Sequence, residues 1–349
     1  MDFQEKLLAS HIAFEEEIDL TDPIHQVRID SLKTFEVKGF PTRKDEAWKY
    51  TSLNTLIRKD YELFPKAETS IDLQKIKKYF LYEIDTYKVV FIDGVYSPFL
   101  SNTTHDGLDV CLISAALTKA KYRDLINTYF NKIANQEDSL TSLNTSYTRE
   151  GAYVYIPKGT VAEKPIEIIH FSTGEEKSLW LQPRNLIVVD QNAQVQIIER
   201  HQSLKEHDVV TNSVTEIYAH QDALLDYYKI QNDLTSAALI DNTYISQDRN
   251  SNVKVHTFSL GGKLIRNNLN FHHKGEHCDS TLKGITILED KQHVDHFTLV
   301  DHSQPNCESH QDYKGVFAGE SKGIFNGKIF VDRLAQKTNA FQQNNNILL

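Results

Sequence analysis

The spacing of apolar residues changes character near residue 150 of this 349-residue chain. Before that point, apolar side chains recur every three or four residues, which is the spacing of amphipathic helices. This spacing predicts helices over residues 3–18, 24–37, 73–84 and 113–135. In the first of these helices, this spacing places four apolar side chains on one side, away from the acidic residues. They are Leu7, Leu8, Ile12 and Phe14.

A hairpin interrupts these helices. Residues 88–101 form two short β-rich runs on either side of Asp93 and Gly94. This residue pair tolerates the positive φ angles of a tight turn. We therefore expect residues 1–145 to form a mixed helical region that contains one hairpin.

The remaining residues, 146–349, form short β-rich runs of alternating polarity, separated by Asn, Asp, Gly and Gln. Similar positions recur in these runs at intervals of 30, 28, 27 and 29 residues, at Val195, Leu225, Val253, Ser280 and Ser309. A strand-only repeat of this length is typical of the coils of a parallel β-helix, or solenoid. A jelly roll or another β-sandwich is the alternative, but the repetition favours the solenoid.

Composition limits the functions open to the chain. Its net charge of −10 argues against a broad nucleic-acid surface, because binding a phosphate backbone needs a concentrated positive face. No apolar run approaches the roughly 20 residues of a membrane span. The three cysteines, Cys111, Cys278 and Cys307, are too few for a disulfide framework. We therefore expect a reduced, cytoplasmic protein that binds neither nucleic acid nor membranes.

Histidine is concentrated in the repeat region, since 11 of the 15 histidines lie between His201 and His310. Imidazole and thiolate are natural ligands for zinc, iron or copper. Residues 271–279 hold four such candidates, which are His272, His273, His277 and Cys278. If a strand continues through this segment, His273 and His277 share a face and Cys278 points away. Because this spacing is not diagnostic, a solvated polar face is favoured over a metal site.

A second group of candidate ligands follows within one repeat. It consists of Asp295, His296, Asp301, His302, Cys307 and His310. Stacked coils could bring His302 or His310 near the earlier group, and the sequence leaves this open. We therefore assign no metal ligand from the sequence.

No motif for catalysis stands out. The chain has no phosphate-binding GxxxxGK[ST] loop, no GxSxG nucleophile elbow and no HExxH zinc helix. Lys291, Asp295 and Asp301 could serve a sugar-cleaving solenoid, but charged residues on an exposed face are the commoner explanation. We expect a non-enzyme without catalytic or cofactor-binding residues. The alternative is a β-helical metal-dependent or sugar-cleaving enzyme that uses residues 272–310.

One charged segment precedes the hairpin, and residues 39–53 read GFPTRKDEAWKYTSL. Thr42 and Asp45 have nearly the spacing of a capping box, and an acidic first turn complements the helix dipole. Trp48 then falls where an aromatic side chain can pack inward. The segment is therefore predicted to start and anchor a helix, and not to carry chemistry.

The same segment resembles the N-terminal signature of the SufD branch of the SufB/SufD family, the scaffold subunits of Suf iron–sulfur cluster assembly. Further segments resemble the core of that family, at residues 154–168, 185–201 and 293–349. The resemblance implies a right-handed parallel β-helix core behind an N-terminal helical region. It also implies a heterodimer with a SufB-like protein, docking of a SufC-like ATPase and a link to iron acquisition. A homodimer is open to the chain alone.

The resemblance stops at Leu349. Family members continue into strands with a Cys-x-His motif and then into helices that bind SufC. Because Ile347, Leu348 and Leu349 would leave an apolar sheet edge, we expect a shortened chain that lacks its C-terminal coils and helical partner-binding segment. The Cys and His that the family places at its subunit interface have no counterpart here. We therefore expect no cofactor on this chain alone, and a nascent iron–sulfur cluster or iron only in the full complex.

Overall fold

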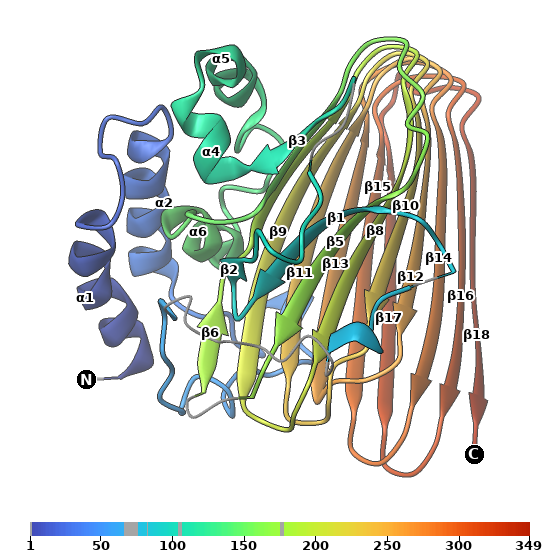
Figure 1. The fold of residues 1–349 in the computed structure, drawn as a ribbon. Helices are drawn as coiled ribbons and strands as arrows, with labels where there is room; N and C mark the ends of the chain where they lie inside the picture. Colours follow the sequence, from blue (N-terminus) through green and yellow to red (C-terminus); the bar gives the residue numbers. More distant parts are fainter. Residues whose placement is uncertain (1, 66–75, 82, 104–106, 175–177) are drawn as a thin grey trace.

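The computed structural model describes residues 2–65, 76–81, 83–103, 107–174 and 178–349. Its main body is a parallel β-solenoid, and the N-terminal helices gather along one side of the first coils (Figure 1). This confirms the solenoid over the sandwich. Among the described helices, none is long and apolar enough to cross a membrane.

From β7 onward, successive strands alternate between two sheets, so each coil contributes one strand to each sheet. The first sheet contains, in spatial order, β18 (Asn339–Leu348), β16 (Glu308–Phe317), β14 (Asp279–Leu288), β12 (Asn252–Ser259), β10 (Leu224–Gln231), β8 (Gln194–Ser203), β5 (Ile166–Ser172), β1 (Tyr87–Ile92) and β2 (Val95–Tyr96). The second contains β17 (Lys322–Val331), β15 (His293–His302), β13 (Leu264–His273), β11 (Ala238–Gln247), β9 (Val209–Ala219), β7 (Arg184–Val189), β4 (Ala152–Ile156) and β3 (Asp109–Leu112), with β6 (Leu179–Leu181) paired to β9.

The coils pair in parallel and in register. The pairing joins in sequence the five positions that recur along the chain, Val195, Leu225, Val253, Ser280 and Ser309. The first three belong to the apolar core between the two sheets. Positions expected to be equivalent are therefore direct neighbours in adjacent coils.

The predicted hairpin is present. β1 and β2 pair antiparallel across Asp93 and Gly94, whose φ angles are 48° and 78°. β1 also pairs in parallel with β5, and β3 pairs antiparallel with β4. Strands from the N-terminal region thus extend both sheets of the solenoid.

The described helices of the N-terminal region are α1 (Phe3–Glu15), α2 (His25–Lys38), α4 (Ile113–Thr118), α5 (Ala120–Tyr129) and α6 (Ser139–Ser146). They confirm three predicted ranges, although extended backbone at Lys119 separates α4 from α5. The fourth range, 73–84, lies partly outside the described residues. No amphipathic pattern marks α6, because all eight of its residues are buried.

The buried face of α1 differs from the expected one. It consists of Phe3, Leu7, His11 and Phe14. Ile12, by contrast, is 70 % exposed. His11 takes the inward position because its Nε2 atom lies 3.3 Å from the Ser146 carbonyl oxygen, which gives the buried imidazole a polar partner.

The segment at residues 39–53 forms a single 3₁₀ turn, η1 (Glu46–Trp48), and the predicted α-helix start is wrong. The Asp45 carboxylate does accept a hydrogen bond from the Thr42 backbone N–H at 2.6 Å, as in half of a capping box. No α-helix follows, because the chain packs against the solenoid at Trp48. The predicted burial of Trp48 is confirmed.

Trp48 docks on the outer face of β13 and β15. The Arg266 guanidinium lies 5.0 Å from the Trp48 ring centroid and 5.2 Å from that of Phe297. Arg266 also donates to the Asp295 carboxylate, which accepts a second hydrogen bond from the Thr51 hydroxyl. Trp48, Thr51, Arg266 and Asp295 are all buried. Each of them therefore depends on the others, and together they hold the N-terminal region against the solenoid.

A polar network also crosses the interior between the sheets. Lys229 Nζ on β10 lies 2.6 Å from the Asp241 carboxylate on β11. Farther along, the His296 ring lies 2.9 Å from Thr286 Oγ1 and 3.3 Å from Asn267 Nδ2. Burial lowers the pKa of His296 to about 3. This imidazole is therefore neutral at physiological pH and serves as a hydrogen-bonding group.

Removing the Trp48 ring should destabilise the protein. We expect Trp48→Ala to lower the free energy of unfolding by about 3–5 kcal/mol, because the change leaves a cavity and uncovers Arg266. Urea unfolding measures this. Tyr50→Ala is the matched control, since Tyr50 is 60 % exposed, and it should change stability by less than about 0.5 kcal/mol. Equal effects of the two variants would contradict the anchoring role of Trp48.

The neutral, buried His296 predicts a loss of stability in acid. Its pKa is about 3 in the folded chain, against 6.5 for an unperturbed imidazole. Between these values the unfolded chain binds a proton that the folded chain does not, so stability falls as pH drops. The contribution is at most about 1.4 kcal/mol per pH unit. In His296→Gln, the free energy of unfolding measured at several pH values should depend less steeply on pH. An unchanged pH dependence would contradict a neutral, buried His296.

Candidate metal centre

Two histidines come together where neighbouring strands end. His273 is the last residue of β13, His302 is the last of β15, and the register pairs them directly. Both side chains are fully buried. Their rings meet edge to face with 4.5 Å between centroids, and their Nδ1 atoms are 3.0 Å apart. Coil stacking alone creates this contact.

Two cysteines lie beside the histidines. Cys278 directly precedes β14 and Cys307 directly precedes β16, at the same place in successive coils. Both are buried free thiols. The Cys307 sulfur and one ring nitrogen each from His273 and His302 lie within 4.8 Å of one another. These three residues are called the His–Cys centre below.

A serine hydroxyl contacts the Nε2 atom of each imidazole. His273 Nε2 lies 2.6 Å from Ser280 Oγ, and His302 Nε2 lies 2.9 Å from Ser309 Oγ. Ser280 donates its own proton to Gln247 Oε1 at 2.5 Å, so it must accept from His273 Nε2–H. With its proton on Nε2, neutral His273 has an unprotonated Nδ1 atom, which faces His302 Nδ1 at 3.0 Å inside the centre.

The environment favours a thiolate at Cys307. Hydrogen bonding by the Cys278 thiol, together with the neighbouring imidazoles of His273 and His302, holds the pKa of the Cys307 thiol below its ordinary value. Donating to Cys307 and being buried both raise the pKa of Cys278. The third cysteine, Cys111, lies elsewhere, and burial raises its pKa to about 11. Of these two cysteines, Cys307 is therefore the one whose thiolate form is favoured.

This arrangement suits a borderline-soft cation. Two imidazole nitrogens and a thiolate form a donor set that zinc and iron(II) accept. Metal-bound histidines usually donate their second ring N–H to a fixed partner, and the Ser280–Gln247 pair provides such a partner for His273. The residues therefore fit a metal ion, although in the metal-free chain the two imidazoles contact each other and the two serines.

Other candidate ligands do not join the centre. His272 faces away from the interior, 3.4 Å from the Asp301 carboxylate, and burial lowers its pKa. His310 is exposed and stacks on the Phe341 ring at 5.2 Å. His277 sits in a turn with a φ of 59°. These histidines are bound to local partners or to solvent.

The expected alternation of side chains around residues 273–278 is wrong. It requires a continuous strand, but β13 ends at His273 and His277 adopts a left-handed turn conformation. The turn resets the alternation, so His273 and Cys278 are buried while His277 is exposed. The spacing of the repeat could have predicted the His–Cys centre from the sequence. His273 and His302 are 29 residues apart, and so are Cys278 and Cys307.

The residues considered for sugar cleavage are not assembled. Lys291 lies in an exposed turn beside Glu320. Asp295 is buried against Arg266, and Asp301 lies against His272. The three side chains are thus engaged in three separate contacts.

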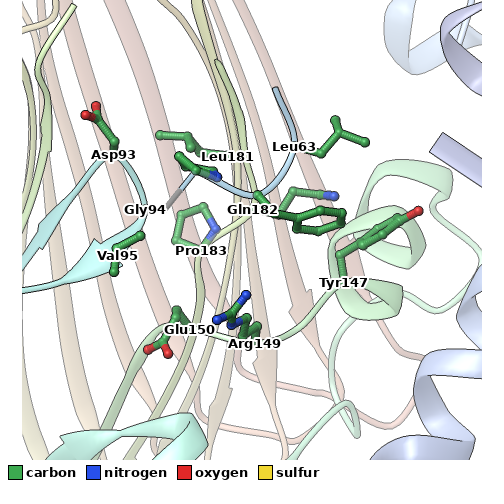
Figure 2. Close-up of a pocket in the computed structure, with 12 residues that line it drawn as sticks. Leu63, Asp93, Gly94, Val95, Tyr147, Arg149, Glu150, Leu181, Gln182 and Pro183 are labelled. Carbon is green, nitrogen blue, oxygen red and sulfur yellow. The ribbon is translucent and has the colours of Figure 1, made fainter. Parts of the chain in front are cut away.

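A small cavity of about 90 Å³ lies apart from the His–Cys centre. Figure 2 shows Asp93 and Gly94 of the hairpin turn on one side of it and Tyr147 on the other. Arg149 and Glu150 lie at its lower edge in this view, and burial raises the pKa of Glu150. None of the described residues that line this cavity is a histidine or a cysteine.

Comparison with known proteins gives two family matches that together span most of the chain. The model described as the SUF system FeS cluster assembly SufBD core domain matches residues 170–349, and the SufBD protein N-terminal region matches residues 7–168. An iron–sulfur cluster assembly SufBD family protein of Synechocystis is 28 % identical over 317 residues, covering 88 % of this chain and 70 % of that protein. Escherichia coli SufD is 25 % identical over 349 residues, covering 97 % and 76 %. Protein ABCI7 of Arabidopsis chloroplasts is 26 % identical over 340 residues, covering 94 % and 69 %.

The His–Cys centre predicts a thiolate in the folded, metal-free chain at neutral pH. Acid titration of the ultraviolet thiolate absorbance should reveal a group with a pKa below about 7, whereas an ordinary thiol titrates near 8.5. Cys307→Ser should abolish this group, and the control Cys111→Ser should retain it. If every native thiol titrates above about 8.5, the hydrogen bonding assigned to Cys307 is wrong.

Proposed function

Because the chain belongs to the SufBD family of SUF-system iron–sulfur cluster assembly proteins, we propose that it is a non-catalytic scaffold subunit of that system. One observation carries the proposal: the core and N-terminal family models match in order on one chain, over residues 7–168 and 170–349. Relatives named SufD in Escherichia coli and Bacillus subtilis support the SufD-type assignment.

The partners in this proposal are a SufB-like protein and a SufC-like ATPase. A scaffold of this kind relies on a partner for ATP hydrolysis, in keeping with a sequence that lacks a phosphate-binding loop. A stacked solenoid offers a long, rigid surface on which partners can dock. A homodimer is the form proposed for the chain without partners, and the cytoplasm is the proposed compartment.

Iron acquisition is the role proposed for this subunit within the complex. Iron and the nascent cluster are cargo in this view, and the cluster forms at a subunit interface. The His–Cys centre supports a role in handling iron, because two imidazoles and a thiolate suit iron(II). It is enclosed by the solenoid, so docking of partners on the outer surface leaves it undisturbed.

Co-purification tests this proposal. The tagged chain, co-expressed with SufB-like and SufC-like proteins of its own organism, should retain the SufB-like protein through size-exclusion chromatography. It should retain the SufC-like protein poorly, because the SufC-binding helices of the family are not expected within residues 1–349. The triple variant His273→Ala, His302→Ala, Cys307→Ser is the control, and it should retain the partners equally because the three residues are buried. A folded chain that captures neither partner would refute the scaffold function.

A further inference from the structure

A second group of ligand-type side chains lies inside the first coils of the solenoid. His170 on β5 and His201 on β8 are paired by the strand register. Glu199 precedes His201 by two residues on the same strand and therefore shares its face. All three side chains are almost completely buried. They come from two adjacent strands, so their backbone positions are fixed.

The geometry converges on one carboxylate oxygen. The two imidazole rings are nearly parallel, at 13°, with 4.7 Å between centroids. Nε2 of His170 lies 3.4 Å from Glu199 Oε1, and Nε2 of His201 lies 3.8 Å from the same atom. Neither nitrogen makes a hydrogen bond. Two buried, unpaired nitrogens thus face one oxygen, and the three donor atoms lie within 4.8 Å of one another.

Neutral groups orient the Glu199 carboxylate. Asn185 Nδ2 donates to Oε1 at 3.0 Å, and the Tyr227 hydroxyl donates to Oε2. Phe91 stacks on the outer side of the His170 ring at 5.1 Å. These neighbours fix both the carboxylate and the ring, as outer partners do around a metal ion. They carry no positive charge that could offset the negative charge of the Glu199 carboxylate.

The nearby cations are already paired with other acids. Arg200 lies 2.8 Å from the Glu167 carboxylate, and Lys229 lies 2.6 Å from that of Asp241. Besides its neutral partners, the Glu199 carboxylate therefore faces only the two imidazoles. A divalent cation bound between the three side chains would give both buried imidazole nitrogens the partner that they lack, and it would also balance the charge of the carboxylate.

We propose that His170, Glu199 and His201 form a metal site for iron(II) inside the solenoid. Two imidazoles and one carboxylate, with the remaining coordination positions open, are the donor set typical of non-haem iron(II). The site contains no sulfur, which distinguishes it from the His–Cys centre. Delivery of this iron to a cluster rests on the proposed function, whereas binding itself does not.

Cobalt(II) is a spectroscopic probe for this site, and iron(II) is titrated in parallel without oxygen. The 349-residue chain carrying His273→Ala and His302→Ala serves as the background, so that the His–Cys centre cannot contribute. Metal is added both to the folded chain and during refolding, because the site is enclosed. The background chain should bind one cobalt(II), with a spectrum that lacks thiolate charge transfer.

Glu199→Gln and His201→Gln in this background should each weaken metal binding by at least about tenfold. Asp248→Asn is the matched control, since Asp248 pairs with His220 at 2.8 Å outside the interior, and it should leave affinity unchanged. Folding of each variant is checked by circular dichroism. If folded Glu199→Gln binds metal as tightly as the background chain, the proposal is overturned.

A thermal measurement covers the case in which the variants do not fold. Metal that binds only the folded chain raises its melting temperature. The background chain should therefore melt at a higher temperature with iron(II) or cobalt(II) than without, and no increase would overturn the proposal. Co-purification with partners is independent of this outcome, so the iron site and the scaffold function fail separately.

Discussion

The in-register pairing of each coil with the next is the constraint on which this structure depends. Parallel strands about 4.8 Å apart place each residue beside the same position of the neighbouring coil. A side chain that recurs along the sequence therefore becomes a contact in space, as at His273 and His302 or at His170 and His201. Enclosed between two sheets, such contacts lose water, and imidazoles and carboxylates must find partners within the protein or bind a cation.

The N-terminal region uses the same solenoid from outside. Two of its strands extend the sheets, and the Trp48 turn packs on Arg266 over the outer face of β13 and β15. The segment with the strongest family resemblance thus acts through packing, and its burial explains why an aromatic residue is needed there. The interior histidines lie within the range that the SufBD core model matches, residues 170–349, whereas the Trp48 turn lies within the range of the N-terminal model, residues 7–168.

Much of the fold follows from repetition and amphipathic spacing, but side-chain partners depend on where turns fall. The recurring positions from Val195 to Ser309 predict the stacking, and the Asp93–Gly94 pair predicts the hairpin. A 29-residue interval also relates His273 to His302 and Cys278 to Cys307, but their convergence requires the left-handed turn at His277. The pairing of His170 with His201 crosses a 31-residue interval and becomes evident only from the strand register. Burial of α6 likewise arises from tertiary packing of Ser and Thr.

The ligand-type side chains inside the solenoid distinguish this structure from an inert scaffold. Anomalous diffraction tests most directly whether they bind a metal ion. Crystals of the chain grown without oxygen in the presence of iron(II) should show an iron peak between His170, Glu199 and His201, inside the coils. Iron found only on exposed histidines such as His277 and His310, with the interior triad hydrogen-bonded and metal-free, would contradict the view that coil stacking builds a metal site.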